Sequence, residues 1–193
     1  MSTMELVIAS NNAHKAHEIK TILAGKFERI YTLAELDIHV EPEETAPDFL
    51  GNATIKATTI AEYTDKAVIA DDSGLMVEAL GGAPGVYSAR YGGEPVSDDR
   101  NNEKLLYEMQ GITDRKAKFV TTMVLLFPTG RKIVGVGEVK GEILTERRGE
   151  NGFGYDPLFY SFELGKTFGE AGEGEKNNVS HRSRALKEIL RQL

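Results

Sequence analysis

The stretch AVIADDSGLMVEALGGAPGVYSARYGG, residues 67–93, decides the expected fold and the expected site. Its first four residues, 67–70, form a short apolar run that predicts a strand buried on both faces. Asp71 and Asp72 follow, and we expect them at the end of that strand, where ligand crevices open in α/β sheets. Because neighbouring carboxylates repel each other, the pair predicts a nearby cation or a shared proton.

The second half of this stretch carries groups that suit an anion. A second apolar run (75–80) leads into residues 81–85, GGAPG, a loop too rich in glycine for regular structure. Ser88, Arg90 and Tyr91 then bring a hydroxyl, a guanidinium and an aromatic ring close together. A carboxylate pair that caps a turn, followed by ordinary loop glycines, is the plain alternative. The complete stretch favours a metal and phosphate site.

Length and composition set the class of protein. A chain of 193 residues suits one large domain or two closely packed lobes. Its 40% hydrophobic and 27% charged residues are typical of a globular protein in water. We expect no membrane association, because no apolar run approaches the roughly 20 residues of a membrane span. No secretion signal is visible.

Charge and cysteine content narrow the partners and the compartment. The net charge of −7 argues against a broad nucleic-acid-binding face. A small anionic ligand remains compatible with that charge, because a bound metal can set the local field. The absence of cysteine excludes disulfides and thiolate metal sites, and it fits an intracellular, cytoplasmic chain.

The N-terminal segment predicts a strand, a polar turn and a helix. Residues 5–10 form the strand, and the helix ends at Gly25. Such a turn presents backbone N–H groups and the positive end of a helix to an anion, and Lys15 adds a point charge suited to phosphate. A plain helix start with asparagine capping and a solvated lysine explains the segment equally, because the glycine pattern of a P-loop is absent.

A second helix is expected after an extended segment, residues 28–41. Thr45 and Asp48 predict a capping-box-like start, with Pro47 in the first turn. The apolar face that follows consists of Phe49, Ala53, Ala57, Ile60 and Ala61. Lys56 lies beside this face, so its ammonium either reaches into a cleft or extends along the surface to water. Glu43 and Glu44 precede the helix. We expect one of them to cap the helix and one to be a metal ligand that faces Asp72.

The rest of the chain predicts a mixed sheet and two more helices. Residues 97–109 form a helix capped by Ser97, and the runs 118–127 and 132–139 form a hairpin. Residues 165–178 predict a mobile polar loop that carries Lys166 and Lys176. Ser180 caps the final helix. His181 and Arg182 in its first turn oppose the helix dipole, so they predict a bound anion or an acceptor-rich ligand, unless water solvates them.

A second glycine-rich stretch, GENGFGYDP, occupies residues 149–157. Phe153, Gly154, Tyr155 and Asp156 combine a flexible backbone with two rings and a carboxylate. Such a loop can stack a base on an aromatic face and hydrogen-bond the edge of that base. A turn whose aromatic residues pack in the core is the alternative, and the segment lacks the strand and helix context of a dinucleotide fingerprint.

Taken together, these stretches resemble the inosine/xanthosine triphosphate pyrophosphatase family. The matching pieces run in order from residue 6 to the C-terminus, and they are SNNAHK (10–15), EET…F…NA…KA (43–57), IADDSGL (69–75), LGGAPGVYSARYGG (80–93), GFGYDPLF (152–159) and EKNNVSHRSRAL (175–186). The resemblance implies an α/β fold with a long mixed sheet, flanking helices and two lobes around a central cleft. Residues 1–193 would form this single domain, and the protein would be a homodimer.

The resemblance also implies Mg²⁺-dependent hydrolysis of ITP, dITP or XTP to the monophosphate and pyrophosphate. Asp72 would be the general base with Asp71 in support, although the sequence does not separate their roles. Asp72 with Glu44 or Glu43 would bind Mg²⁺, a hard cation that prefers oxygen ligands. Lys56 would also be catalytic, because lysines stabilise the charge that develops on the phosphate oxygens. Lys15, Lys56 and Ser73 would hold the phosphates, and Ser10, Asn11, Asn12 and Arg90 would be further substrate contacts.

The same resemblance assigns the purine base to the C-terminal motifs. Phe153 or Tyr155 would stack the base beside Gly154, and Asp156 would accept a ring N–H. Lys176, His181 and Arg182 would close over the base. Arg182 offers only donors, so it suits the carbonyl at position 6 of hypoxanthine and xanthine and disfavours the amino group of adenine.

Two other functions fit parts of the sequence. One is an aspartate-dependent phosphatase, whose Asp-x-Asp pattern differs from the contiguous pair here. The other is a non-catalytic purine nucleotide-binding regulatory module, which would bind triphosphates without turnover.

Overall fold

The computed structural model describes residues 4–193, and the chain divides into two compact units. Unit 1 comprises the chain up to Asp72 together with Thr121–Gly137 and Arg182–Leu193, and unit 2 comprises Ser73–Val120 and Glu138–His181. The first three residues of the predicted domain lie outside the described part. Within residues 4–193, no helix combines the length and the apolar character that crossing a membrane requires.

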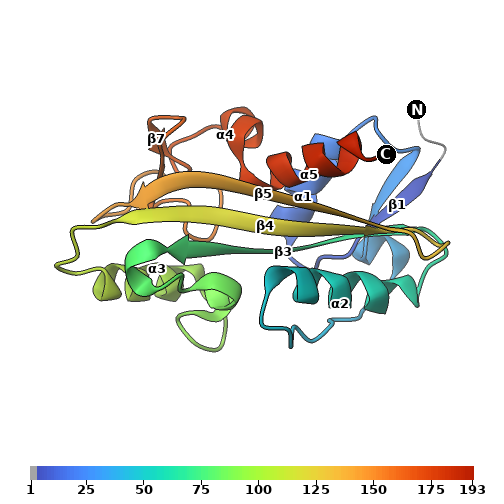
Figure 1. Cartoon of the computed structure of the whole chain (residues 1–193), viewed down its shortest axis with the longest axis horizontal. Coiled ribbons are helices and arrows are strands. Elements are labelled where there is room, and N and C mark those ends of the chain that lie inside the picture. The colour runs from blue at the N-terminus through green and yellow to red at the C-terminus, as the bar shows by residue number, and fades with distance from the viewer. Residues whose placement is uncertain (1–3) are drawn as a thin grey trace. The chain divides into compact units, whose positions relative to one another are not determined.

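The elements confirm the predicted mixed α/β class (Figure 1). Seven strands are hydrogen-bonded in the order β2-β1-β3-β4-β5-β6-β7. β1 pairs in parallel with β2 and β3, whereas β5–β6 and β6–β7 are antiparallel. The bounds are β1 (Glu5–Ile8), α1 (Ala13–Leu23), β2 (Arg29–Thr32), α2 (Phe49–Ala61), β3 (Ala67–Val77), α3 (Asp98–Glu108), β4 (Lys116–Leu126), β5 (Lys132–Ile143), β6 (Phe159–Ser161), β7 (Lys166–Thr167), α4 (Glu173–Val179) and α5 (His181–Arg191).

Strand alternation builds the two cores of unit 1. Successive side chains of a strand point to opposite faces of the sheet. Ile69 of β3 accordingly packs in a cluster with residues of α1 and α5, whereas its neighbours Val68 and Ala70 pack with residues of α2. Figure 1 shows α1 and α5 on one side of these strands and α2 on the other. The apolar run 67–70 is therefore buried on both faces, as its sequence predicts.

Unit 2 has one apolar cluster. Leu75 and Val77 of β3 pack there with Leu105 and Met109 of α3. Three phenylalanine rings extend the cluster: Phe119 lies 4.5 Å from Phe159 and 5.9 Å from Phe168 between ring centroids. The predicted helix of residues 97–109 is confirmed, and the side chain of its N-cap Ser97 accepts from the backbone N–H of Arg100.

The predicted hairpin is confirmed, but the predicted end of the strand at the acidic pair is wrong. β4 and β5 are adjacent strands joined by a short turn in which the N–H of Phe127 donates to the carbonyl of Arg131, so the hairpin is confirmed. β3 does not end before Asp71. It continues through both aspartates to Val77, because the apolar residues 75 and 77 supply a further buried face.

The second helix starts later than predicted. Its N-cap is Asp48, which adopts extended backbone angles and accepts from the N–H of Gly51 at 2.7 Å. Thr45 and Pro47 lie before the helix, because the residue that precedes a proline is disfavoured in helical geometry. The expected extended segment 28–41 is also only partly extended, since a 3-10 turn, Ala34–Leu36, follows β2.

The segment expected as a polar loop, residues 165–178, contains β7 and most of α4. At the start of α4, the N–H of Gly172 donates to the Glu175 side chain at 3.0 Å. Lys176 of this helix is buried rather than solvated. Ser180 lies between α4 and α5 as the C-cap of α4.

Candidate functional site

The acidic pair of β3 presents its two carboxylates to opposite faces of the sheet. Asp71 continues the face of Ile69, and Asp72 continues the face of Ala70. The side-chain contacts agree with this alternation, because Asp71 forms ion pairs with residues of α1 and α5 whereas Asp72 accepts a hydrogen bond from a residue of α2. Asp71 is 1% exposed and Asp72 is 3% exposed. The two carboxylates therefore have separate surroundings, and their contiguity does not imply a shared proton.

Asp71 lies among cations. Its Oδ2 is 3.3 Å from Nζ of Lys15 and 3.5 Å from Nε of Arg182. Arg182 also forms an ion pair with Glu18 of α1, with 3.2 Å between Nη1 and Oε2. Arg182 and Glu18 are both buried. Burial lowers the pKa of Lys15, and the charge of Asp71 opposes that effect.

Asp72 lies in an amide and lysine environment. Asn52 of α2 donates from Nδ2 to Oδ2 of Asp72 at 3.1 Å, and its own Oδ1 accepts from the N–H of Ala46 at 2.9 Å. Burial raises the pKa of Asp72 from 3.8 to about 6, against the opposing charge of Lys56. The value of about 6 already includes the charge of Glu44, which also raises this pKa. The carboxyl of Asp72 is thus tuned toward neutral pH.

Lys56 links the second acidic residue to β3. Its Nζ is 2.6 Å from Oε1 of Glu44 and donates to the backbone carbonyl of Asp71 at 2.9 Å. Burial lowers the pKa of Lys56, but the charges of Asp71 and Glu44 outweigh burial and the pKa rises. The side chain therefore reaches inward and remains a cation, in place of the solvated surface position that the sequence also allowed.

The carboxylates near Lys56 fit a cation that needs few protein ligands. Glu44 and Asp72 lie close enough for the charge of one to raise the pKa of the other, so a divalent cation would relieve their repulsion. Glu43 is exposed, whereas Glu44 is partly buried beside Lys56. Within residues 4–193, no group of three or more His, Cys, Asp or Glu side chains gathers as a metal cage. Mg²⁺ is compatible with that arrangement, because it usually keeps several waters.

The predicted phosphate residues at the start of α1 form an N-terminal turn. Asn12 caps α1 and accepts from the N–H of Lys15 at 3.1 Å. The hydroxyl of Ser10 accepts from the N–H of Asn12 at 3.1 Å, and Asn11 donates to the carbonyl of Val40 at 3.1 Å. Asn11 and Asn12 are exposed, so this turn lies at the surface.

In unit 2, Ser88 joins β3 to the end of the glycine-rich loop, residues 81–85. Its hydroxyl accepts from the N–H of Leu75 at 2.9 Å and donates to the carbonyl of Gly85 at 2.6 Å. Ser73 is half-buried on β3, before this contact. Arg90 lies over the exposed ring of Tyr87, with 5.1 Å from its Cζ to the ring centroid.

The predicted base loop is a tight turn organised by Asp156. Its Oδ2 accepts from the N–H of Phe153 at 3.0 Å and from Nζ of Lys176 at 2.8 Å. The same ammonium lies 4.7 Å from the centroid of the Phe153 ring. Gly152 has a φ of 73°, and a Cβ there would overlap the carboxylate of Asp156. The loop therefore requires glycine at this position.

The two aromatic residues of this loop differ in burial. Phe153 is partly exposed, whereas Tyr155 is 5% exposed in the core of unit 2. The Tyr155 hydroxyl donates to the carbonyl of Ser88 at 2.6 Å, and burial raises its pKa. His181 is also buried, and its ring stacks on Phe119 with 4.9 Å between centroids. Of the two rings in this loop, Phe153 is therefore the more exposed.

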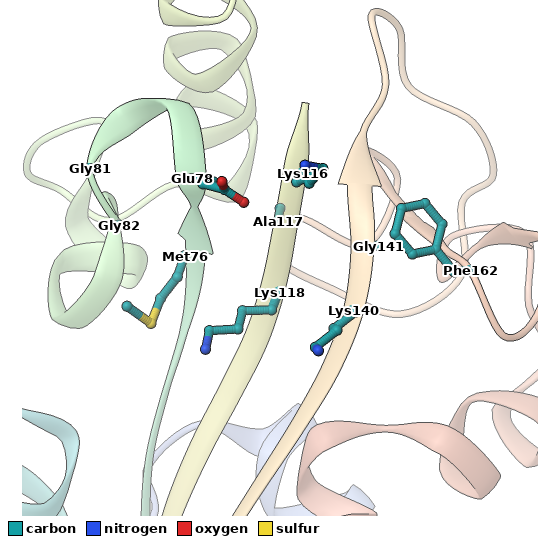
Figure 2. Close-up of a pocket in the computed structure, with 10 residues that line it drawn as sticks. All are labelled: Met76, Glu78, Gly81, Gly82, Lys116, Ala117, Lys118, Lys140, Gly141 and Phe162. Atoms are coloured by element: carbon teal, nitrogen blue, oxygen red, sulfur yellow. The ribbon is translucent and has the colours of Figure 1, made fainter. Parts of the chain in front are cut away.

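Unit 2 also contains a cavity away from these residues. Figure 2 shows it over β3, β4 and β5, where the side chains of Met76, Lys118, Lys140 and Phe162 contribute to its lining. Its volume is about 540 Å³. The residues that are described as its lining include none of the predicted substrate residues. Lys118 is paired there with Glu138 at 3.2 Å.

Sequence reasoning missed Asn52 and Glu18. Asn52 lies one turn before Lys56 on the buried side of α2, and a polar amide beside apolar positions was the available signal. Glu18 is a buried carboxylate one turn after Lys15 on α1, and its partner Arg182 lies 164 residues away in the chain. Nothing local to α1 indicates that pairing.

The fold and the two residue sets define an α/β protein with a carboxylate–lysine centre and an aromatic, glycine-rich loop. The sequence model of the Ham1 family matches residues 6–192. The chain therefore belongs to the Ham1 family. The resemblance drawn from the motifs is confirmed.

Similar proteins cover almost the whole chain. A protein of Clostridium tetani named dITP/XTP pyrophosphatase is 46% identical over 191 residues, covering 97% of this chain and 95% of its own. The Ham1 protein of Staphylococcus aureus is 44% identical with a TM-score of 0.84, covering 95% and 94% of the two chains. A Ham1 protein of Coxiella burnetii is 36% identical with a TM-score of 0.87, covering 98% and 100%.

Proposed function

We propose that this protein hydrolyses the triphosphates of non-canonical purine nucleosides, ITP, dITP or XTP, to the monophosphate and pyrophosphate. Family membership and the names of the similar proteins support this activity. The observation that carries the chemistry is the buried Asp72, with its pKa of about 6, beside Lys56 and Glu44. Removing such triphosphates would protect the nucleotide pool of the cytoplasm, where we place the protein.

The surroundings of the two aspartates support separate roles. A general base works best when its pKa lies near the operating pH, which suits Asp72. Asp71 is ion-paired with Lys15 and Arg182, so it would orient these cations rather than accept a proton. We propose that Asp72 accepts the proton of the attacking water. The water would attack the α-phosphorus, so that pyrophosphate leaves intact.

We propose Mg²⁺ as the cofactor, with Glu44 and Asp72 as its protein ligands and exposed Glu43 as the less suitable candidate. When bound, Mg²⁺ would neutralise charge that develops on the phosphate oxygens. Asp72 cannot be a tight ligand and a free base at once, so we assign the stronger metal contact to Glu44. Lys56 would then hold a phosphate oxygen while its bond to the Asp71 carbonyl keeps it in place.

The other predicted residues fall into a phosphate set and a base set. For the phosphate set we propose Lys15, Lys56, Ser73 and Arg90 together with the exposed N-terminal turn of α1, which has the polarity that anions prefer. That turn contributes Ser10, Asn11 and Asn12. For the base set we propose Phe153 as the stacking ring, with Gly154, Asp156, Lys176 and His181 around the base. Tyr155 would support this loop from the core.

We propose that Arg182 contributes to base choice through its donors while it forms ion pairs with Glu18 and Asp71. We further propose that residues 1–193 act as one ITPase-like domain of two lobes and that two copies form a homodimer. Light scattering of the purified protein tests the dimer.

Product analysis tests the proposed function. The purified protein would be incubated with ITP, XTP, GTP and ATP, with Mg²⁺ and with a chelator. We expect pyrophosphate from ITP and XTP, little from ATP, and no product with chelator. Asp72→Asn should lower the rate by about 10²–10⁴-fold, the usual contribution of a general base. Orthophosphate without base preference would indicate a phosphatase, and tight binding without turnover would indicate a regulatory module.

A further inference from the structure

Two side chains of α3 hold the backbone of Gly154 in the base loop. Oδ2 of Asp98 accepts from the N–H of Gly154 at 2.9 Å. Nδ2 of Asn102 donates to the carbonyl of Gly154 at 2.9 Å. Asp98 and Asn102 are four residues apart, so they lie on the same face of the helix. Both backbone polar groups of one loop residue are thus bound by a single helix face.

The consequence falls on Phe153. Its own N–H donates to Oδ2 of Asp156, and the next N–H in the chain, that of Gly154, donates to Asp98. The two peptide planes that flank the Cα of Phe153 are therefore each fixed by a carboxylate. Because φ and ψ at that residue are set by these planes, the direction of its Cα–Cβ bond, from which the ring projects, is set as well.

Asn102 makes its contacts at a cost. It is 3% exposed, and within residues 4–193 its Oδ1 has no hydrogen-bond partner. A buried acceptor without a partner is unfavourable, and an apolar side chain would avoid that penalty. The two bonds from Nδ2, to the carbonyls of Asp98 and Gly154, account for an amide at this position. Packing alone does not.

We propose that Asp98 and Asn102 are positioning residues for purine recognition, acting through Gly154 on the ring of Phe153. This inference rests on the proposed function and adds two residues to it. Neither residue was among the sequence predictions. A purely structural anchor would lower stability without altering the choice of base, and that difference makes the proposal testable.

The test compares Asp98→Ala with two matched variants. Asp98 is exposed, so its replacement should leave the fold intact. Asp98→Asn keeps a carbonyl oxygen for the N–H of Gly154. Asp99→Ala removes the neighbouring first-turn carboxylate, which contacts Arg147 and not Gly154. Both alanine variants lose one charge near the helix N-terminus, so the helix-dipole effect is matched.

The measurements are kcat and KM for ITP and ATP, and the Kd of IMP and of inorganic pyrophosphate. We expect Asp98→Ala to raise KM for ITP and Kd for IMP about threefold to tenfold, the worth of one hydrogen bond. The preference for ITP over ATP should fall, whereas kcat and pyrophosphate binding should stay unchanged. Asp98→Asn and Asp99→Ala should behave as the unmodified protein. Asn102→Ala should change the same quantities in the same direction.

Several results would overturn the inference. They are equal weakening of IMP and pyrophosphate, an unchanged ITP-over-ATP ratio in Asp98→Ala, or the same loss in Asp99→Ala. If Asn102→Ala does not fold, the Asp98 variants decide. If the unmodified protein hydrolyses no purine triphosphate, the proposed function fails separately, and the IMP and pyrophosphate affinities still test the loop. Failure of the unmodified protein to bind IMP would refute the positioning role.

Discussion

Replacing Asp72 with asparagine should stabilise the metal-free protein above pH 6 while it removes hydrolysis. Burial raises the pKa of this carboxyl from 3.8 to about 6 in the folded protein. That rise corresponds to about 3 kcal/mol between the protonated and ionised forms. Because the folded state binds this proton more tightly than the unfolded state, the stability that it contributes is lost as pH rises through about 6. Asparagine carries no such titration.

The assay is urea unfolding of both proteins in chelator between pH 4 and pH 8. Other titrating groups are common to both proteins, so they cancel in the difference between the two free energies of unfolding. That difference should favour Asp72→Asn by about 0.5 kcal/mol at pH 4 and should grow to about 3 kcal/mol above pH 7. Asn52 can still donate to the new amide oxygen, so its own hydrogen bond is kept.

Asp71→Asn is the matched control on the other face of β3. It removes a carboxylate that is ion-paired with Lys15 and Arg182, so it should destabilise the protein at pH 7 by about 3–5 kcal/mol. Opposite signs for two adjacent, isosteric replacements would follow only from different surroundings. A pH-independent difference for Asp72→Asn, or a loss of stability above pH 6, would refute burial as the cause of the raised pKa.

Three further outcomes are expected. Phe153→Ala should raise KM for ITP by about 5–100-fold in steady-state kinetics, since stacking on one base is worth about 1–3 kcal/mol. Tyr155→Phe should leave KM unchanged and lower the free energy of unfolding in urea by about 1 kcal/mol, because it removes one hydrogen bond. Equal KM values for the two variants would contradict the assignment of Phe153 as the stacking ring. Arg182→Met should lower the free energy of unfolding in urea by about 3–5 kcal/mol, because it removes this cation from the buried carboxylates of Glu18 and Asp71. A loss below about 1 kcal/mol would show that these ion pairs are weak. Gly152→Ala should raise KM for ITP more than it lowers kcat, since a Cβ would displace the carboxylate of Asp156; unchanged KM would show that the turn tolerates the side chain.

Local patterns were sufficient for the elements with apolar periodicity. The strand face 67–70 and the helix capped by Ser97 follow from spacing and capping residues alone. α4 could not be predicted in this way, because EGEKNNV has no apolar stripe. Its buried anchor is Lys176, whose partner Asp156 lies 20 residues earlier. A helix that is held by such a tertiary ion pair leaves no periodic signal in its own sequence.

The acidic centre shows the same limit at the level of chemistry. Motifs identify Asp71 and Asp72 as a pair, and an interpretation based on a strand end treats them as neighbours that repel each other. Continuation of β3 to Val77 changes that interpretation, since residues inside a strand alternate between faces. Asp71 then forms ion pairs with cations from α1 and α5, whereas the pKa of Asp72, beside α2, is raised toward neutral pH. The different surroundings of the two carboxylates thus follow from the alternation of neighbouring residues along β3, which the motif alone does not show.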